Sequence, residues 1–124
     1  MNLIIAWLWI LLGFIGGSLL GLRFHREDWL GGYASHCRRL YRLGHISFFG
    51  LGILNLLFYF TVQELRASGL GPGIAAWGFV LGAATMPVCC LLMAHRPQWR
   101  GVFAVPVTSL ITAGVATVVT LLSL

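Results

Sequence analysis

Histidine and arginine are the side chains of this sequence with the most potential for chemistry. Arg38, Arg42 and His45 follow the spacing i, i+4, i+7, which places them on one face of a helix. Two guanidinium groups followed by an imidazole on the same helix face could bind an anionic amphiphile. Haem fits with His45 as axial ligand and the arginines on the propionates, and a quinone headgroup or a phospholipid fits the same face. The simpler alternative is that these side chains anchor a helix at the membrane surface.

No other pattern in the sequence indicates catalysis or metal binding. The chain lacks a phosphate-binding loop, a metal-protease helix, and a nucleophile at a usable spacing from a base. Its cysteines, Cys37 and the adjacent Cys89 and Cys90, form no CxxC motif. We therefore expect no metal site and no autonomous enzyme.

The composition indicates that lipid is the solvent for most of the surface. Of 124 residues, 59% are hydrophobic and 9% are charged, whereas soluble domains carry about 25% charged residues. The net charge of +5 comes from arginines that flank apolar segments. Topology and anionic lipid explain that charge better than nucleic acid, which we exclude as a partner.

Four apolar runs are each long enough to cross about 30 Å of hydrocarbon as a helix. They cover residues 3–22, 43–62, 74–94 and 102–122. The sequence therefore predicts a single-domain, all-α membrane protein, a bundle of four transmembrane helices. Ser35 is a candidate cap that would extend the second helix back to His36. Gly71-Pro72-Gly73 predicts a turn before the third helix.

The distribution of arginine predicts the orientation of the chain. Residues 23–42 and 95–101 contain seven arginines, whereas residues 63–73 contain only Arg66. By the positive-inside rule the first and third connections are cytoplasmic and both termini are extracytoplasmic. A bacterial cytoplasmic membrane is the expected location, since a chain with arginine and no lysine is typical of a GC-rich genome. Tryptophans near the predicted interfaces agree with a fixed depth: Trp7, Trp9, Trp29, Trp77 and Trp99.

Glycines form bare stripes on two of the predicted helices. The first stripe consists of Gly13, Gly17 and Gly21, and the second of Gly78 and Gly82. A stripe of this kind lets a second helix backbone approach closely. The stripes are therefore expected to pack helices together, either within the bundle or against another transmembrane subunit.

Polar groups inside the spans are few, and Asn55 is the most costly of them to bury. We expect Asn55 to bond a neighbouring helix. The candidate partners are Tyr59, Thr85, Thr108 and Thr112. Pro87 removes a backbone bond to the Ala83 carbonyl and should kink the third helix. The spans contain no carboxylate, which argues against a proton-coupled antiporter.

These observations favour an accessory subunit of a larger membrane complex, most plausibly one in electron transfer or energy conversion. The expected partners are membrane lipids and other transmembrane subunits. One alternative is a haem- or quinone-binding redox subunit that uses the His45 face. Another is a homo-oligomeric channel or carrier in which Asn55, Tyr59 and the threonines of the fourth helix line a water-filled pathway.

The predicted orientation can be tested by cysteine labelling of intact cells. A membrane-impermeant thiol reagent added outside should modify a cysteine introduced at Ser68 and leave the native Cys37 unmodified, because residues 23–42 face the cytoplasm. The opposite labelling pattern would contradict the assigned orientation.

Overall fold

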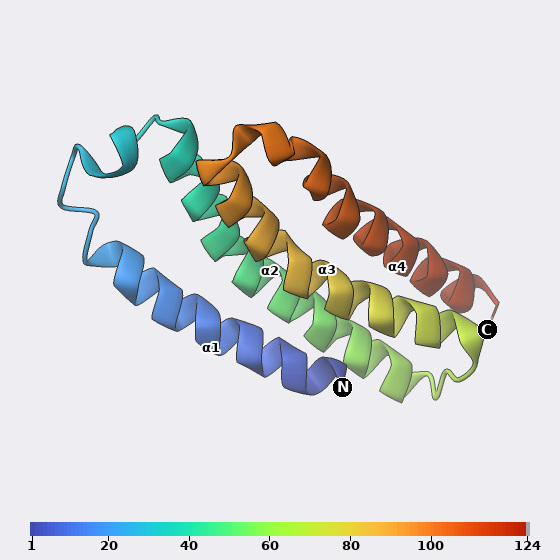
Figure 1. Cartoon of the computed structure of the whole chain (residues 1–124). Coiled ribbons are helices and arrows are strands. Elements are labelled where there is room, and N and C mark those ends of the chain that lie inside the picture. The colour runs from blue at the N-terminus through green and yellow to red at the C-terminus, as the bar shows by residue number, and fades with distance from the viewer. Residues whose placement is uncertain (124) are drawn as a thin grey trace.

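A computed structural model describes residues 1–123 as four long helices joined by short connections (Figure 1). The helices are α1 (Asn2–Gly21), α2 (His36–Glu64), α3 (Leu70–His95) and α4 (Ala104–Leu122), and two short 3-10 helices cover Trp29–Gly31 and Pro97–Phe103. All four long segments are apolar and long enough to span a membrane. The predicted all-α, four-span fold is therefore confirmed.

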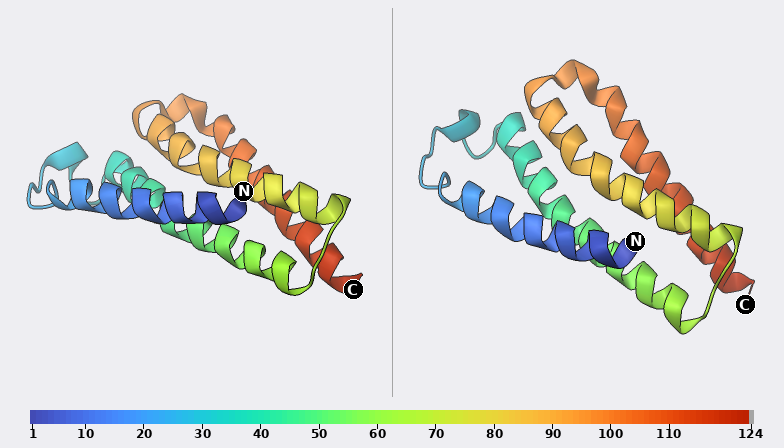
Figure 2. Two further views of the ribbon diagram at one scale, coloured as in Figure 1. Left: turned by 90° about the horizontal axis from the view of Figure 1, so that it is seen from below. Right: turned by 60° about the horizontal axis from the view of Figure 1, so that its bottom comes forward.

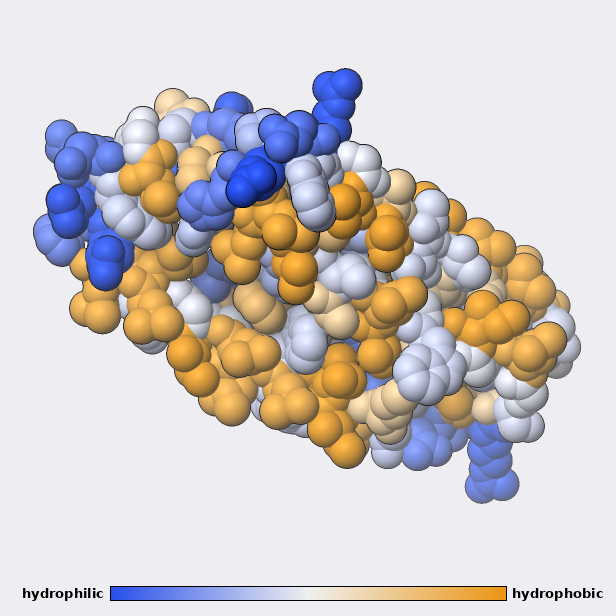
Figure 3. Space-filling view, viewed as in Figure 1, coloured by the Kyte–Doolittle hydropathy of each residue, from blue (hydrophilic) through white to orange (hydrophobic). Residues whose placement is uncertain are grey.

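Each helix runs antiparallel to the next one along the chain, and α2 and α3 lie at the centre of the bundle. Helix α1 packs mainly on α2 and makes a smaller contact with α3, while α4 packs on α3 (Figures 1 and 2). Within the described residues, no Cα atom of α1 lies within 8 Å of one in α4. Both termini lie at the end opposite residues 22–35. Figure 3 shows apolar side chains over the middle of the molecule and polar ones at its two ends.

The second helix begins where its predicted cap lies. Ser35 Oγ accepts a hydrogen bond of 3.1 Å from the Arg38 amide, and its own hydroxyl donates to the Leu30 carbonyl at 2.6 Å. The predicted turn at Gly71-Pro72-Gly73 was wrong, because these residues lie in the first turn of α3. Proline is tolerated there since its missing N–H would have no helical partner.

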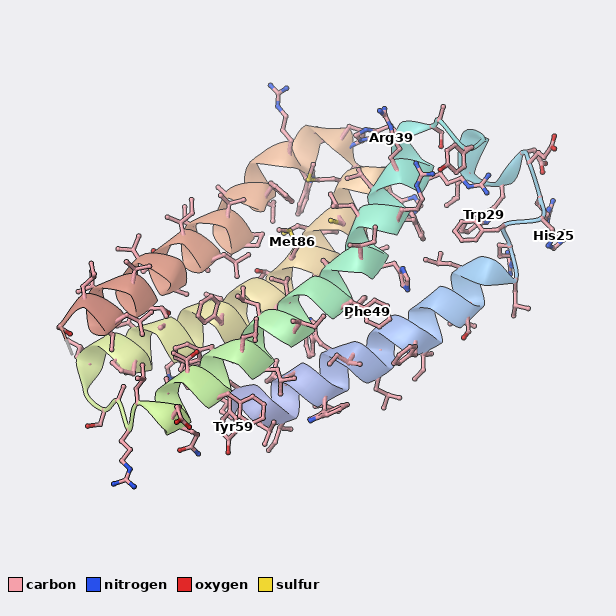
Figure 4. All side chains as sticks on the ribbon, turned by 180° about the vertical axis from the view of Figure 1, so that it is seen from behind. His25, Trp29, Arg39, Phe49, Tyr59 and Met86 are labelled. Atoms are coloured by element: carbon pink, nitrogen blue, oxygen red, sulfur yellow. The ribbon has the colours of Figure 1, made fainter. Side chains whose placement is uncertain are left out.

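Four of the five glycines in the predicted stripes pack against neighbours within the chain, and Gly21 does not. A Cβ atom at Gly13 would lie 2.9 Å from the Phe49 ring, and one at Gly17 would lie 2.6 Å from His45 Nε2. In Figure 4 the Phe49 side chain projects from α2 toward α1. On α3, Gly78 meets Ala113 of α4. A further set of contacts joins Gly82 to Leu110 of α4 and Gly52 of α2 to the Ala6 carbonyl of α1.

Asn55 is fully buried, and its partners differ from those predicted. Asn2 donates from Nδ2 to Asn55 Oδ1 at 2.8 Å and to the Ala76 carbonyl at 3.1 Å. Asn55 donates in turn to the carbonyls of Leu51 and Phe79. The pair therefore joins α1, α2 and α3. The predicted partners bond elsewhere: Thr85 to Leu81, Thr108 to Ala104, and Tyr59 to Gln63.

The backbone carbonyl that Pro87 frees is bonded by α1. Proline has no N–H to donate to the Ala83 carbonyl, so this oxygen lacks its helical partner. The Trp9 indole of α1 donates to it at 2.9 Å. Helix α3 continues through Pro87 to His95 as one element. Trp9 was expected at the interface, but it faces inward because a free carbonyl in hydrocarbon is costly.

This bond predicts a specific interaction between two substitutions. Trp9→Phe should lower the free energy of unfolding by about 1 kcal/mol, because the Ala83 carbonyl loses its donor. In a Pro87→Ala background the new amide can donate to that carbonyl, so Trp9→Phe should cost less than half as much. Unfolding titrations in mixed micelles would measure this double-mutant cycle.

Trp7→Phe provides the matched control, since Trp7 lies on the same helix and is 61% exposed. It should give the same small effect in both backgrounds. Equal costs for Trp9→Phe with and without Pro87 would show that the indole stabilises the bundle only by packing.

Candidate functional site

A cavity of about 340 Å³ opens between α1, α2 and α3. It lies toward the arginine-rich end of the molecule, which is the end that holds the connections over residues 22–35 and 96–103. Its size is at the lower end of known small-ligand sites. Its lining is largely aliphatic and aromatic and comprises Gly16, Leu19, Leu20, Tyr41, Gly44, His45, Phe48, Pro87 and Leu91. Among the described lining residues the polar side chains are Tyr41 and His45. An apolar cavity with a few fixed polar groups is the usual form of a ligand site.

His45 is held in one orientation by α1. Its Nε2 lies 2.9 Å from the Gly13 carbonyl oxygen, and its ring packs edge-on against Phe49. A carbonyl only accepts, so Nε2 carries the proton and, in the neutral ring, Nδ1 offers a lone pair. The close approach at Gly17 gives the ring its space. The geometry therefore presents an oriented imidazole beside the cavity.

Tyr41 connects the cavity to the end of α3. Its hydroxyl lies 2.9 Å from His95 Nε2, and the two rings stack edge-on at 5.8 Å. Trp29 also packs edge-on against the Tyr41 ring, with centroids 6.0 Å apart. His95 is exposed at the last residue of α3. These contacts fix Tyr41 between the apolar cavity and the polar end of the molecule.

Arg38 and Arg42 lie in a different environment from His45. The Arg38 guanidinium is surrounded by three aromatic rings at 5.3–5.7 Å from their centroids, those of Phe24, Trp29 and Tyr33. Arg42 lies 4.1 Å from the centroid of the same Tyr33 ring. The structure thus divides the predicted i, i+4, i+7 set in two, with the arginines under residues 24–33 and His45 at the cavity.

Apart from Gly21, the other predicted site residues have structural neighbours. Asn55, Gly13, Gly78 and Gly82 pack or bond within the bundle, and Gly21 has no described atom within 4 Å of a Cβ placed on it. Sequence reasoning missed Tyr41 and Tyr33 as site residues. Tyr41 lies three residues after Arg38 and four before His45, so helical spacing could have identified it.

No known protein family, curated protein or solved structure matches this chain. The chemistry of the site therefore rests on its own residues.

The position of His45 predicts unequal effects of two alanine substitutions on one stripe. Gly17→Ala should lower the free energy of unfolding by about 1–3 kcal/mol, because its Cβ would lie 2.6 Å from His45 Nε2. Gly21→Ala is the matched control and should change it by less than about 0.5 kcal/mol. Mixed-micelle unfolding titrations measure both. Equal effects would mean that His45 and the neighbouring part of α2 can move away from a Cβ atom at position 17 without a cost in stability.

Proposed function

We propose that the protein binds a small membrane amphiphile in the cavity between α1, α2 and α3, with a quinol or quinone headgroup as the best fit. The observation that carries this proposal is the oriented His45 imidazole at the edge of an apolar cavity of about 340 Å³. The flat rings of Phe48 and Tyr41 and the side chains of Leu19 and Leu91 suit a hydrophobic ring. An isoprenoid tail would continue between the helices into the bilayer.

The two polar groups suit a ring that carries hydroxyl or carbonyl oxygens. His45 Nδ1 can accept a hydrogen bond from a ligand hydroxyl, because Nε2 already donates to Gly13. Tyr41, one turn before His45 on α2, can contribute a second polar contact. Quinols and quinones carry such oxygens on a flat, otherwise apolar ring, which suits an apolar cavity with its polar side chains on α2.

Haem fits this geometry less well than a quinone. The Nε2 atom of His45 faces the Gly13 carbonyl, so iron ligation through it would require that hydrogen bond to break. The arginines expected on the propionates stack on Tyr33 instead.

We further propose that the protein acts as a subunit of an electron-transfer or energy-converting complex in a bacterial cytoplasmic membrane. The proposed binding of a lipid-soluble redox carrier between the helices would suit that role, and so would the lack of a catalytic motif in the sequence. The glycine stripes give it little support, because every stripe glycine except Gly21 already packs against another helix of the chain. The channel alternative is weakened as well, since Thr85, Thr108 and Thr117 bond their own helix backbones.

Titration of a short-chain benzoquinol into nanodisc-embedded protein tests the cavity site. His45→Phe should weaken binding about tenfold, which corresponds to the loss of one hydrogen bond of about 1.4 kcal/mol. Gly16→Leu should weaken it further, because the new side chain would occupy the cavity that Gly16 lines. Gly21→Leu on the same helix is the control and should bind like the unmodified protein.

Equal uptake by all four proteins would mean that the quinol only partitions into the lipid. An absorption spectrum of the purified protein separates the haem alternative. Haem bands that disappear in His45→Ala would replace the quinone with haem as the ligand of this site.

A further inference from the structure

Two guanidinium groups at the arginine-rich end of the molecule, those of the buried Arg38 and the half-buried Arg42, have no carboxylate partner within the described residues. Arg38 is 4% exposed, and its guanidinium donates only long hydrogen bonds, of 3.5 Å to the Glu27 carbonyl and 3.4 Å to the Phe24 carbonyl. Within residues 1–123 the only ion pair joins Arg26 and Asp28, at 3.9 Å. The positive charges of Arg38 and Arg42 are therefore balanced only by ring faces and carbonyl dipoles.

Two of the nitrogen atoms in these groups lack any acceptor. Arg38 Nε and Arg42 Nη1 are both buried, and neither has a hydrogen-bond partner in the described part of the chain. A buried donor without an acceptor is costly, and more so when it is charged. Tyr33 lies over both guanidinium groups, at 4.1 Å from Arg42 and 5.7 Å from Arg38. Both orphaned donors thus belong to one cluster.

We propose that Arg38 and Arg42 form a site for one phosphate-type anion, covered by the Tyr33 ring. A phosphodiester or phosphate oxygen bonds strongly to guanidinium N–H groups and would supply the missing acceptors. Tyr33 is 70% exposed, so its ring can turn toward water and admit the anion. The preceding Gly31 and Gly32 have φ values of 83° and 93°, which glycine adopts at little cost.

This site is separate from the cavity that holds the proposed amphiphile. The described lining of the cavity includes His45 and Tyr41 and neither arginine. The anion site therefore stands or fails independently of the quinone proposal, and variants of Arg42 leave the cavity lining unchanged.

Thermal unfolding in maltoside micelles, which contain no phosphate, tests the proposal. The protein should unfold at a higher temperature when phosphatidylglycerol is added to these micelles than in the micelles alone. Native mass spectrometry should show one retained phosphatidylglycerol. Arg42→Gln should abolish most of the shift and weaken lipid retention at least tenfold. Arg39→Gln, which removes the same charge from an exposed side chain of α2, should keep both within twofold.

Inorganic phosphate added to the lipid-free maltoside micelles distinguishes the source of the anion. Stabilisation of the unmodified protein but not of Arg42→Gln would assign the site to the phosphate group alone. Stabilisation by phosphatidylglycerol only would assign it to a lipid headgroup. Arg38→Gln is a second variant, but it also removes the contacts that order residues 24–33, so Arg42→Gln carries the test. Equal losses in Arg39→Gln and Arg42→Gln, or no shift with either anion, would overturn the proposal.

Discussion

Hydrocarbon offers no hydrogen bonds, and this constraint explains most of the specific contacts between the helices. Asn2 and Asn55 bond each other and the carbonyls of α2 and α3, so no water is needed at that depth. Trp9 bonds the carbonyl that Pro87 leaves free. Both sets of bonds connect α1 with α3, and the asparagine pair also includes α2. The polar side chains therefore fix which helices are neighbours and in which register they pack, because contacts between apolar surfaces alone do not specify a register.

Close backbone approach is the second requirement, and it places the candidate ligand site. The bare surface of α1 at Gly13 and Gly17 accepts the Phe49 and His45 rings of α2. That contact turns His45 Nε2 onto the Gly13 carbonyl and leaves the rest of the imidazole beside the cavity. A glycine stripe that would serve helix docking in another protein here gives a histidine its orientation. Packing and the proposed binding chemistry thus depend on the same seam.

The arginine-rich end combines this packing with an unusual electrostatic arrangement. Residues 24–33 fold over α2 because the Arg38 guanidinium holds their carbonyls and aromatic rings together. An isolated buried cation is unfavourable, and cation–π contacts offset only part of that cost. Arg39 projects away from the same end (Figure 4), in agreement with ordinary interfacial anchoring. Neighbouring arginines on one helix therefore have different roles, which their loop contacts decide.

The sequence by itself determined the membrane class, the four spans and the Ser35 start of the second helix, because hydropathy and capping are local properties. It also identified Asn55, His45, Pro87 and the glycine stripes as features that needed partners. Only the tertiary structure decided those partners, as when Asn2 rather than a threonine bonded Asn55. Helical periodicity placed Arg38, Arg42 and His45 on one face, yet residues 24–33 and α1 compete for that face and divide it. The periodicity of one helix cannot specify which neighbour covers it, since that depends on contacts between residues far apart in the chain.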